Sequence, residues 1–143
     1  MVKEIFVNLP VKDINKTKQF FSALGFTFRP EFTDENAGCL ILGKGIYAML
    51  LAEKFFKTFI PGKEISDAKR STEVLNALTL DSKKAVDEMM KKVIEAGGRE
   101  FRPIEDSGWM YGGAFEDLDG HIWEIFYMDE NKMPEAMKIK GRE

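Results

Sequence analysis

The sequence predicts an α+β fold built from two βαβββ modules that form a curved mixed sheet, or cup. Three observations predict it. A strand-like run precedes each of two amphipathic helical segments, three short strand-like runs follow each helix, and this order occurs twice along the 143 residues. Asp13 and Asp81 take equivalent positions in the two repeats. At this length a single domain over residues 1–143 is expected.

The first module begins with the strand-forming run Ile5–Leu9, which Pro10 stops. Asp13 stands where a helix N-cap belongs. The helix predicted over residues 14–24 has an apolar stripe at i, i+3, i+4 spacing, and Gly25 ends it. Three strands are then predicted over 26–32, 39–42 and 46–51.

The second module repeats the pattern. A strand is predicted over residues 74–80, and Asp81 or Ser82 can cap a helix that runs to about Ala96. Two glycines at 97–98 end that helix. Three further strands are predicted over 99–104, 111–115 and 122–128.

The connection between the modules is long for a compact domain. The sequence divides into module one at about 1–51, a link at about 52–72, module two at about 73–128 and a C-terminal tail at about 129–143. A short helix is predicted over 53–58. The rest of the link is either a lid or a packed surface connection.

Composition narrows the class of protein. With 44% hydrophobic and 31% charged residues, the chain is typical of a globular protein. A net charge of −3 with both signs interspersed argues against a nucleic-acid partner, which requires a basic patch. No apolar run approaches the roughly 18 residues of a membrane span. Cys39 has no partner for an internal disulfide, and no signal-peptide pattern is seen, so a cytoplasmic location is expected.

Two stretches resemble motifs of a known superfamily. Residues 8–26 resemble the opening motif L-x-V-x-D-hydrophobic … F-Y-x-x-L-G-F, and residues 116–125 resemble the closing motif x-D-P-D-G-x-x-hydrophobic-E. Both belong to the vicinal oxygen chelate superfamily, which includes glyoxalase I, bleomycin- and fosfomycin-resistance proteins and extradiol dioxygenases. The resemblance covers about 2–128 and implies the two-module fold. It leaves the reaction open, because this fold hosts several chemistries.

The resemblance also implies where a metal would lie. Metal-dependent members are similar in using four ligands on four strands, typically a His or Gln and a Glu from one half and a His and a Glu from the other. Counted from the motifs, these positions fall on Phe6, near Leu50, on Leu75 and on Glu124. Only Glu124 has a ligand atom. We therefore expect no metal and no other cofactor, with a non-standard divalent metal site as the alternative.

The single histidine does not restore a metal site. His121 stands three residues before Glu124, so an ideal strand points the two side chains to opposite faces. We expect His121 to make local hydrogen bonds at the exit of a turn. Asp117 and Asp119, beside Gly120, are typical of turn chemistry and lack the spacing of a calcium loop.

Apolar side chains at the ligand positions predict a small-molecule pocket with a few polar anchors. The predicted lining is Phe6, Asn8, Leu50, Leu75, Ala77, Trp109, Tyr111, Ile122 and Phe126. For Trp109 and Tyr111, packing in the core or in a dimer is an equal alternative.

Glu124 is the candidate catalytic residue. Desolvation among apolar neighbours would favour its protonated form, so that it could serve as a general base or orient a ligand. The alternative is a carboxylate neutralised by a hydrogen bond or by a neighbouring Arg or Lys.

Three functions stay open at this point. The first is a metal-independent protein that binds a small organic molecule in an apolar cup. The second is a lyase, isomerase or dioxygenase of the superfamily that uses a non-standard metal or Glu124 alone. The third is a non-catalytic interaction domain whose cup is filled by side chains, which 12 Phe and 8 Met residues allow. A homodimer would cover exposed strand edges.

Overall fold

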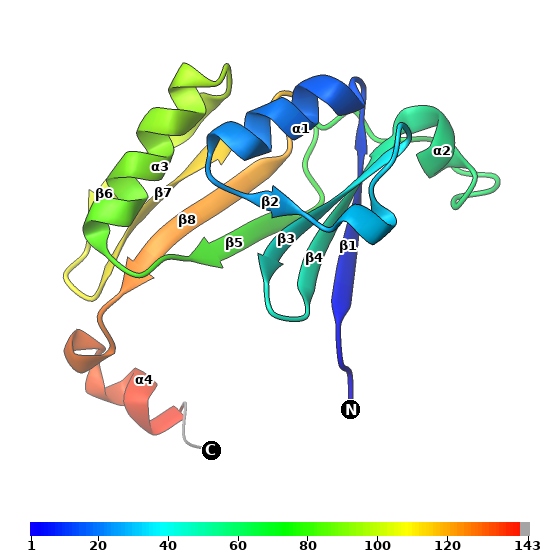
Figure 1. Ribbon diagram of the computed structural model, residues 1–143. Coiled ribbons are helices and arrows are strands. Elements are labelled where there is room, and N and C mark those ends of the chain that lie inside the picture. Colours follow the sequence, from blue (N-terminus) through cyan, green and yellow to red (C-terminus); the bar gives the residue numbers. More distant parts are fainter. Residues whose placement is uncertain (141–143) are drawn as a thin grey trace. The chain divides into compact units, whose positions relative to one another are not determined.

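A computed structural model describes residues 1–140, the last two by their backbone alone. The chain divides into two compact units, one over Met1–Ser71 and one from Thr72 onward. Each unit contains a mixed four-stranded sheet covered on one face by a helix (Figure 1). The predicted α+β fold with two βαβββ modules is therefore confirmed, while the single-domain organisation stays a prediction.

The first unit has strand order β1-β4-β3-β2, in which β1 and β4 are parallel and the other neighbours antiparallel. Its elements are β1 (Ile5–Val11), α1 (Ile14–Ala23), β2 (Thr27–Phe28), η1 (Pro30–Phe32), β3 (Ala37–Gly43), β4 (Ile46–Ala52) and α2 (Glu53–Lys57).

Helix α1 begins and ends where the sequence predicts. The Asp13 carboxylate accepts a hydrogen bond from the Lys16 backbone N–H at 3.0 Å, which satisfies one of the free donors of the first turn. Gly25 follows the helix with a φ of 100°, a value that glycine adopts without strain. The strand predicted over 26–32 is wrong in extent, because Pro30 starts a short 3-10 helix after two strand residues.

The core of the first unit lies between α1 and the sheet. Leu9 and Leu50 are paired in register on β1 and β4 and are 5% and 0% exposed. Phe20 and Phe21 of α1 are buried with them. Alternation along β1 then places Phe6 and Asn8 on the opposite face, which we call the open face of the sheet.

The second unit repeats this topology with strand order β5-β8-β7-β6. Strands β5 and β8 are parallel, and the other neighbours are antiparallel. Its elements are β5 (Leu75–Thr79), α3 (Lys83–Glu95), β6 (Arg99–Asp106), β7 (Met110–Glu116), β8 (Ile122–Met128), η2 (Glu130–Lys132) and α4 (Glu135–Lys140).

Helix α3 is capped by Ser82, whose hydroxyl oxygen accepts from the Ala85 backbone N–H at 3.0 Å. Its apolar stripe, Val86, Met90 and Val93, is buried. On the helix-facing side of the sheet, Trp123 and Ile125 of β8 and Phe115 of β7 are at most 1% exposed.

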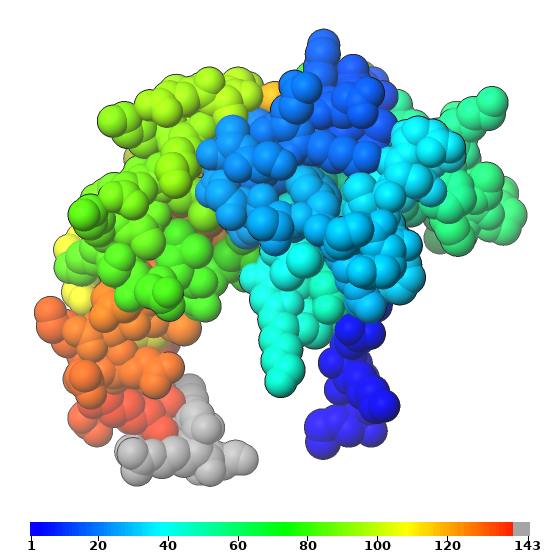
Figure 2. Space-filling view, in the orientation of Figure 1, coloured from blue at the N-terminus to red at the C-terminus, as the bar shows by residue number. Residues whose placement is uncertain are grey.

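The link between the modules begins as predicted and then loses regular structure. The short helix α2 contacts β1 and β4, and residues 58–74 form turns and irregular segments. Figure 2 shows α2 and the residues that follow it at the edge of the first unit. A role as a lid stays a prediction. Within the described part of the chain, no helix is long and apolar enough to cross a membrane.

Candidate ligand-binding site

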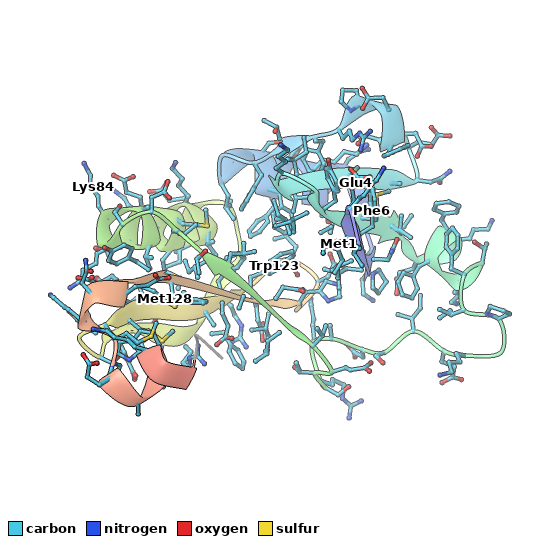
Figure 3. All side chains as sticks on the ribbon, turned by 90° about the horizontal axis from the view of Figure 1, so that it is seen from below. Met1, Glu4, Phe6, Lys84, Trp123 and Met128 are labelled. Carbon is cyan, nitrogen blue, oxygen red and sulfur yellow. The ribbon has the colours of Figure 1, made fainter. Side chains whose placement is uncertain are left out.

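The open face of the second sheet carries the candidate site. Ile122, Glu124 and Phe126 alternate along β8 with the buried Trp123 and Ile125, so they point away from α3. Figure 3 shows this helix with Lys84 on its outer side, away from the sheet.

Glu124 lies between two small neighbours. Strand β5 places Ala77 beside it, and β7 places Ala114 on its other side. Arg102 of β6 pairs in register with Ala114, one strand further out. Because the Ala114 side chain is a single methyl group, the long Arg102 side chain can extend over it to Glu124.

Arg102 and Glu124 form a direct ion pair across this gap. Arg102 Nη2 donates to Glu124 Oε2 at 2.5 Å, a charge-assisted hydrogen bond. The Glu124 side chain is 23% exposed and the Arg102 side chain 52%. The expected setting of Glu124 among hydrocarbon alone is therefore wrong, and the alternative of a neutralising Arg or Lys is the one found.

Irregular pairing in β6 brings a second carboxylate to this face. The register between β6 and β7 shifts twice, between Glu100 and Arg102 and again between Arg102 and Glu105. In a regular strand, residues three apart point to opposite faces. The β-bulge puts Glu105 on the same side as Arg102. Pro103 fits here because β6 is an edge strand.

These side chains surround a cavity of about 430 Å³. The residues that line it all belong to the second unit: Ala77, Arg102, Glu105, Ser107, Met110, Gly112, Gly113, Glu124 and Phe126. The volume lies within the range of small-molecule sites, which is about 300–1,000 Å³.

Two glycines are required by the close approach of neighbouring strands. A Cβ on Gly112 would overlap the Ile125 carbonyl oxygen and the Phe126 Cβ. A Cβ on Gly113 would lie 2.7 Å from the Arg102 carbonyl oxygen. Backbone would have to shift in both cases, so glycine here lets β6, β7 and β8 pack together beneath the cavity.

The turn that leads into β8 is held by one buried carboxylate. Asp117 is 7% exposed and accepts hydrogen bonds from the backbone N–H groups of Asp119 and His121, at 2.9 and 3.0 Å. It also accepts from Trp123 Nε1 at 3.0 Å. Burial raises the pKa of the Asp117 carboxyl above its usual range. Asp117 thereby anchors the residue directly before Glu124.

Three of the predicted pocket and catalytic residues line the cavity: Ala77, Glu124 and Phe126. Leu75 and Ile122 are paired in register on the same face, but they lie at the far ends of β5 and β8 and do not line it. Leu75 is 50% exposed and Ile122 is buried at 5%.

Tyr111 does not line the cavity, and of the two expected settings it takes the one in which it packs within the fold. It is paired with Tyr127 on the helix-facing side, and its hydroxyl donates to Asp87 Oδ1 of α3 at 2.7 Å. This hydrogen bond raises the pKa of Tyr111. Trp109 lies in the turn before β7 and is not part of the lining, to which this segment contributes Met110.

Leu50 is a correction to the predicted lining. It pairs with Leu9 and is fully buried beneath α1, on the face opposite Phe6 and Asn8. The residue equivalent to Glu124 is instead Met49. Met49 pairs with Asn8 of β1, and Glu124 pairs with Ala77 of β5. Asn8 and Ala77 are equivalent because each lies five residues before the N-cap of the helix that follows.

Phe6 and Asn8 lie on the open face of the first unit and are not among the residues that line the cavity. The Phe6 ring stacks on Tyr47 with centroids 4.8 Å apart. The Arg29 guanidinium lies over the rings of Phe32 and Tyr47, at 4.5 and 5.5 Å from their centroids. Arg29 also donates to Glu31 at 3.1 Å, and this hydrogen bond raises its pKa.

The residues present do not fit a four-ligand metal centre. The equivalent positions hold Phe6, Met49 and Leu75, and the remaining carboxylate of Glu124 is paired with Arg102. Hard divalent ions require several oxygen or nitrogen ligands aimed at one point. Among the described residues no three His, Cys, Asp or Glu side chains are close enough to hold one ion.

Sequence reasoning missed Arg102, Glu105 and Ser107. Arg102 lies two strands from Glu124, and no sequence spacing indicates that contact. Glu105 reaches the open face only through the β-bulge. The proline at position 103 marked an edge strand, which is where bulges are frequent, and was the one usable signal.

Two βαβββ modules, each with a mixed four-stranded sheet, define the class of fold. The family model described as "Bleomycin resistance protein-like N-terminal" matches residues 3–43. Among solved structures, the hypothetical protein SA1046 from S. aureus is 29% identical, with a TM-score of 0.74 over 89% of this chain and 95% of that chain. The chain is therefore similar over residues 3–43 to the bleomycin resistance protein-like family, and its fold is that of solved structures of the glyoxalase/bleomycin resistance/dioxygenase family.

Two further structures share the fold at lower identity. A glyoxalase-related enzyme from Fulvimarina pelagi is 19% identical, with a TM-score of 0.75 over 89% of this chain and 88% of that chain. The bleomycin resistance determinant encoded on transposon Tn5 is 22% identical, with a TM-score of 0.60 over 88% and 98%. No curated protein sequence matches the chain significantly.

Proposed function

We propose that this protein binds a small organic molecule in the cavity of its second unit and does so without a metal ion. The observation that carries the proposal is a cavity of about 430 Å³ on the open face of the sheet, with the Arg102–Glu124 ion pair in its wall. Its size and its mixture of apolar surface with a few convergent polar groups are typical of ligand sites.

The composition of the wall supports binding more than chemistry. Met110 and Phe126 offer apolar surface, and Arg102 and Glu124 offer hydrogen-bonding groups at fixed positions. A general base must be free to take a proton, whereas the Glu124 carboxylate already accepts a charge-assisted hydrogen bond. We therefore propose that Glu124 orients a ligand, together with Arg102.

The two alternatives have less support. A metal-dependent lyase or dioxygenase would need ligands that Phe6, Met49 and Leu75 do not supply. An interaction domain has one favourable observation, because two apolar residues are exposed at an edge of the sheet: Val74, directly before the edge strand β5, is 49% exposed, and Leu75, its first residue, is 50% exposed. Pairing of two copies along this edge would cover both side chains, so a homodimer stays part of the proposal. A cytoplasmic location also stays part of the proposal.

The test is a titration of ¹⁵N-labelled protein with a small set of aromatic fragments, followed by two-dimensional NMR. Shifts are expected to concentrate on the residues that line the cavity. The variant Glu124→Gln is expected to weaken fragment binding while changing the free energy of unfolding by about 1 kcal/mol or less, as for other exposed ion pairs.

A matched control exists in the same sheet. Arg99 and Glu116 form an ion pair between β6 and β7 at 2.8 Å, and neither lines the cavity. Glu116→Gln should therefore leave fragment binding unchanged. If Glu124→Gln alters stability alone, or if both variants weaken binding equally, Glu124 has no role in ligand binding.

A further inference from the structure

The charges of the cavity do not cancel. Its lining contains two carboxylates, Glu105 and Glu124, and one guanidinium, Arg102, which together give a net charge of −1. Arg102 is already paired with Glu124. Glu105 has no ion-pair partner within the described residues, although it is exposed on the same wall.

Glu105 faces the cavity because of the β-bulge in β6. Without the register shift between Arg102 and Glu105, the carboxylate would point to the other face of β6. With the shift, both carboxylates face one space. A positively charged group placed there gains attraction from both of them, and because the wall is partly exposed this attraction is moderate and sensitive to salt.

An anionic ligand meets the opposite situation. It would have to compete with Glu124 for the Arg102 guanidinium, which already donates a hydrogen bond to the Glu124 carboxylate. It would also be repelled by the Glu105 carboxylate. The rest of the wall is apolar or small, with Met110, Phe126 and Ala77. A ligand that matches this wall has a cationic head and an apolar body.

Resting on the proposed function, we infer that the cavity selects a small organic cation: a protonated amine whose ammonium group faces Glu105 and Glu124 and whose apolar body packs on Met110 and Phe126. Arg102 is then a positioning residue, which holds Glu124 at the wall through their ion pair.

The experiment compares three probes of similar shape and different charge, namely benzylamine, benzyl alcohol and benzoate. Each is titrated into ¹⁵N-labelled protein at low and at high salt. Benzylamine is expected to bind most tightly, benzyl alcohol next and benzoate least. The advantage of benzylamine over benzyl alcohol is expected to shrink at high salt, because salt screens partly exposed charges.

Three variants assign the effect to residues. Glu105→Gln is expected to weaken benzylamine binding by about two- to fivefold and to leave benzyl alcohol binding unchanged. Glu100→Gln is the control, because Glu100 is an exposed carboxylate of the same strand that does not line the cavity. Arg102→Gln removes a positive charge from the wall, so the preference for benzylamine over benzyl alcohol should increase. A smaller preference for benzylamine in this variant would contradict the inference.

The outcomes separate the inference from the proposed function. If benzoate binds more tightly than benzylamine at the cavity, the charge inference is wrong and the binding site stands. If the probes bind equally and Glu105→Gln changes nothing, the inference is again wrong. If none of the probes shifts the residues of the cavity, the proposed function itself is contradicted.

Discussion

The two modules share one architecture and differ on their open faces. Each unit has an arginine beside the equivalent residue of its inner strand. Arg29, directly after β2, donates its backbone N–H to the Cys39 carbonyl oxygen, and Arg102 of β6 pairs with Ala114. In the first unit the guanidinium lies over the rings of Phe32 and Tyr47. In the second, the Arg102 side chain reaches over Ala114 to Glu124 beside a cavity.

The comparison shows that the same arrangement of strands can carry different side chains on its open face. The first unit has Phe6, Tyr47 and Met49 where the second has Leu75, Ile122 and Glu124. Arg29 therefore contacts aromatic rings of the first unit, through cation–π interactions. The same topology thus carries an aromatic cluster in one module and a candidate binding site in the other.

The largest expected effect tests the glycine beneath the cavity. Gly112 of the second unit is equivalent to Ala37 of the first, which pairs with Leu51 as Gly112 pairs with Phe126. Because a Cβ at position 112 would overlap β8, Gly112→Ala should destabilise the protein by about 3 kcal/mol. Urea unfolding measures this. Ala37→Gly is the control, at about 1 kcal/mol or less. If Gly112→Ala and Ala37→Gly lower the free energy of unfolding equally, β7 and β8 do not approach each other closely at Gly112.

The second largest expected effect is the loss of stability in Asp117→Asn. Replacing it by Asn turns one acceptor oxygen into a donor among three N–H groups, and should cost about 1–3 kcal/mol in thermal or urea unfolding. Lys44, in the corresponding β3–β4 turn of the first unit, should tolerate Lys44→Gln. A small cost for Asp117→Asn would show that these hydrogen bonds are not what holds the turn.

The pH dependence of Asp117 follows from its raised pKa. A carboxyl whose pKa is higher in the folded than in the unfolded protein contributes stability at low pH, and this contribution is lost as pH rises through the folded value. Wild type should therefore lose stability relative to Asp117→Asn as pH rises above about 4, the unperturbed carboxyl range. Parallel pH profiles for the two proteins would contradict the burial of this charge.

The smallest expected effect concerns the aromatic cluster on the open face of the first unit. Tyr47→Leu removes the ring on which Phe6 stacks, at a cost of about 0.5–1.5 kcal/mol. It should leave fragment binding in the second unit unchanged. A loss of fragment binding in this variant would mean that the site is not confined to the second unit.

Periodicity predicted the two modules well because helix stripes and strand alternation are local. Asp13 and the apolar residues of α1 and α3 indicated the elements that the structure contains. The site was predicted only in part. Ala77, Glu124 and Phe126 follow from alternation on two strands, whereas Arg102 and Glu105 depend on a β-bulge and on contacts across three strands. The prediction that Leu50 lines the pocket was wrong by one residue, because neighbouring residues of a strand point to opposite faces of the sheet and Met49 is the one on the open face.

The metal content of the protein, purified without chelators and measured by mass spectrometry of the elements, tests the central claim most directly. With a guanidinium bound to the single carboxylate that occupies a ligand position, we expect far less than one equivalent of Zn, Ni, Fe or Mn per chain. A stoichiometric divalent metal that is lost in Glu124→Gln but kept in Glu116→Gln would contradict the account.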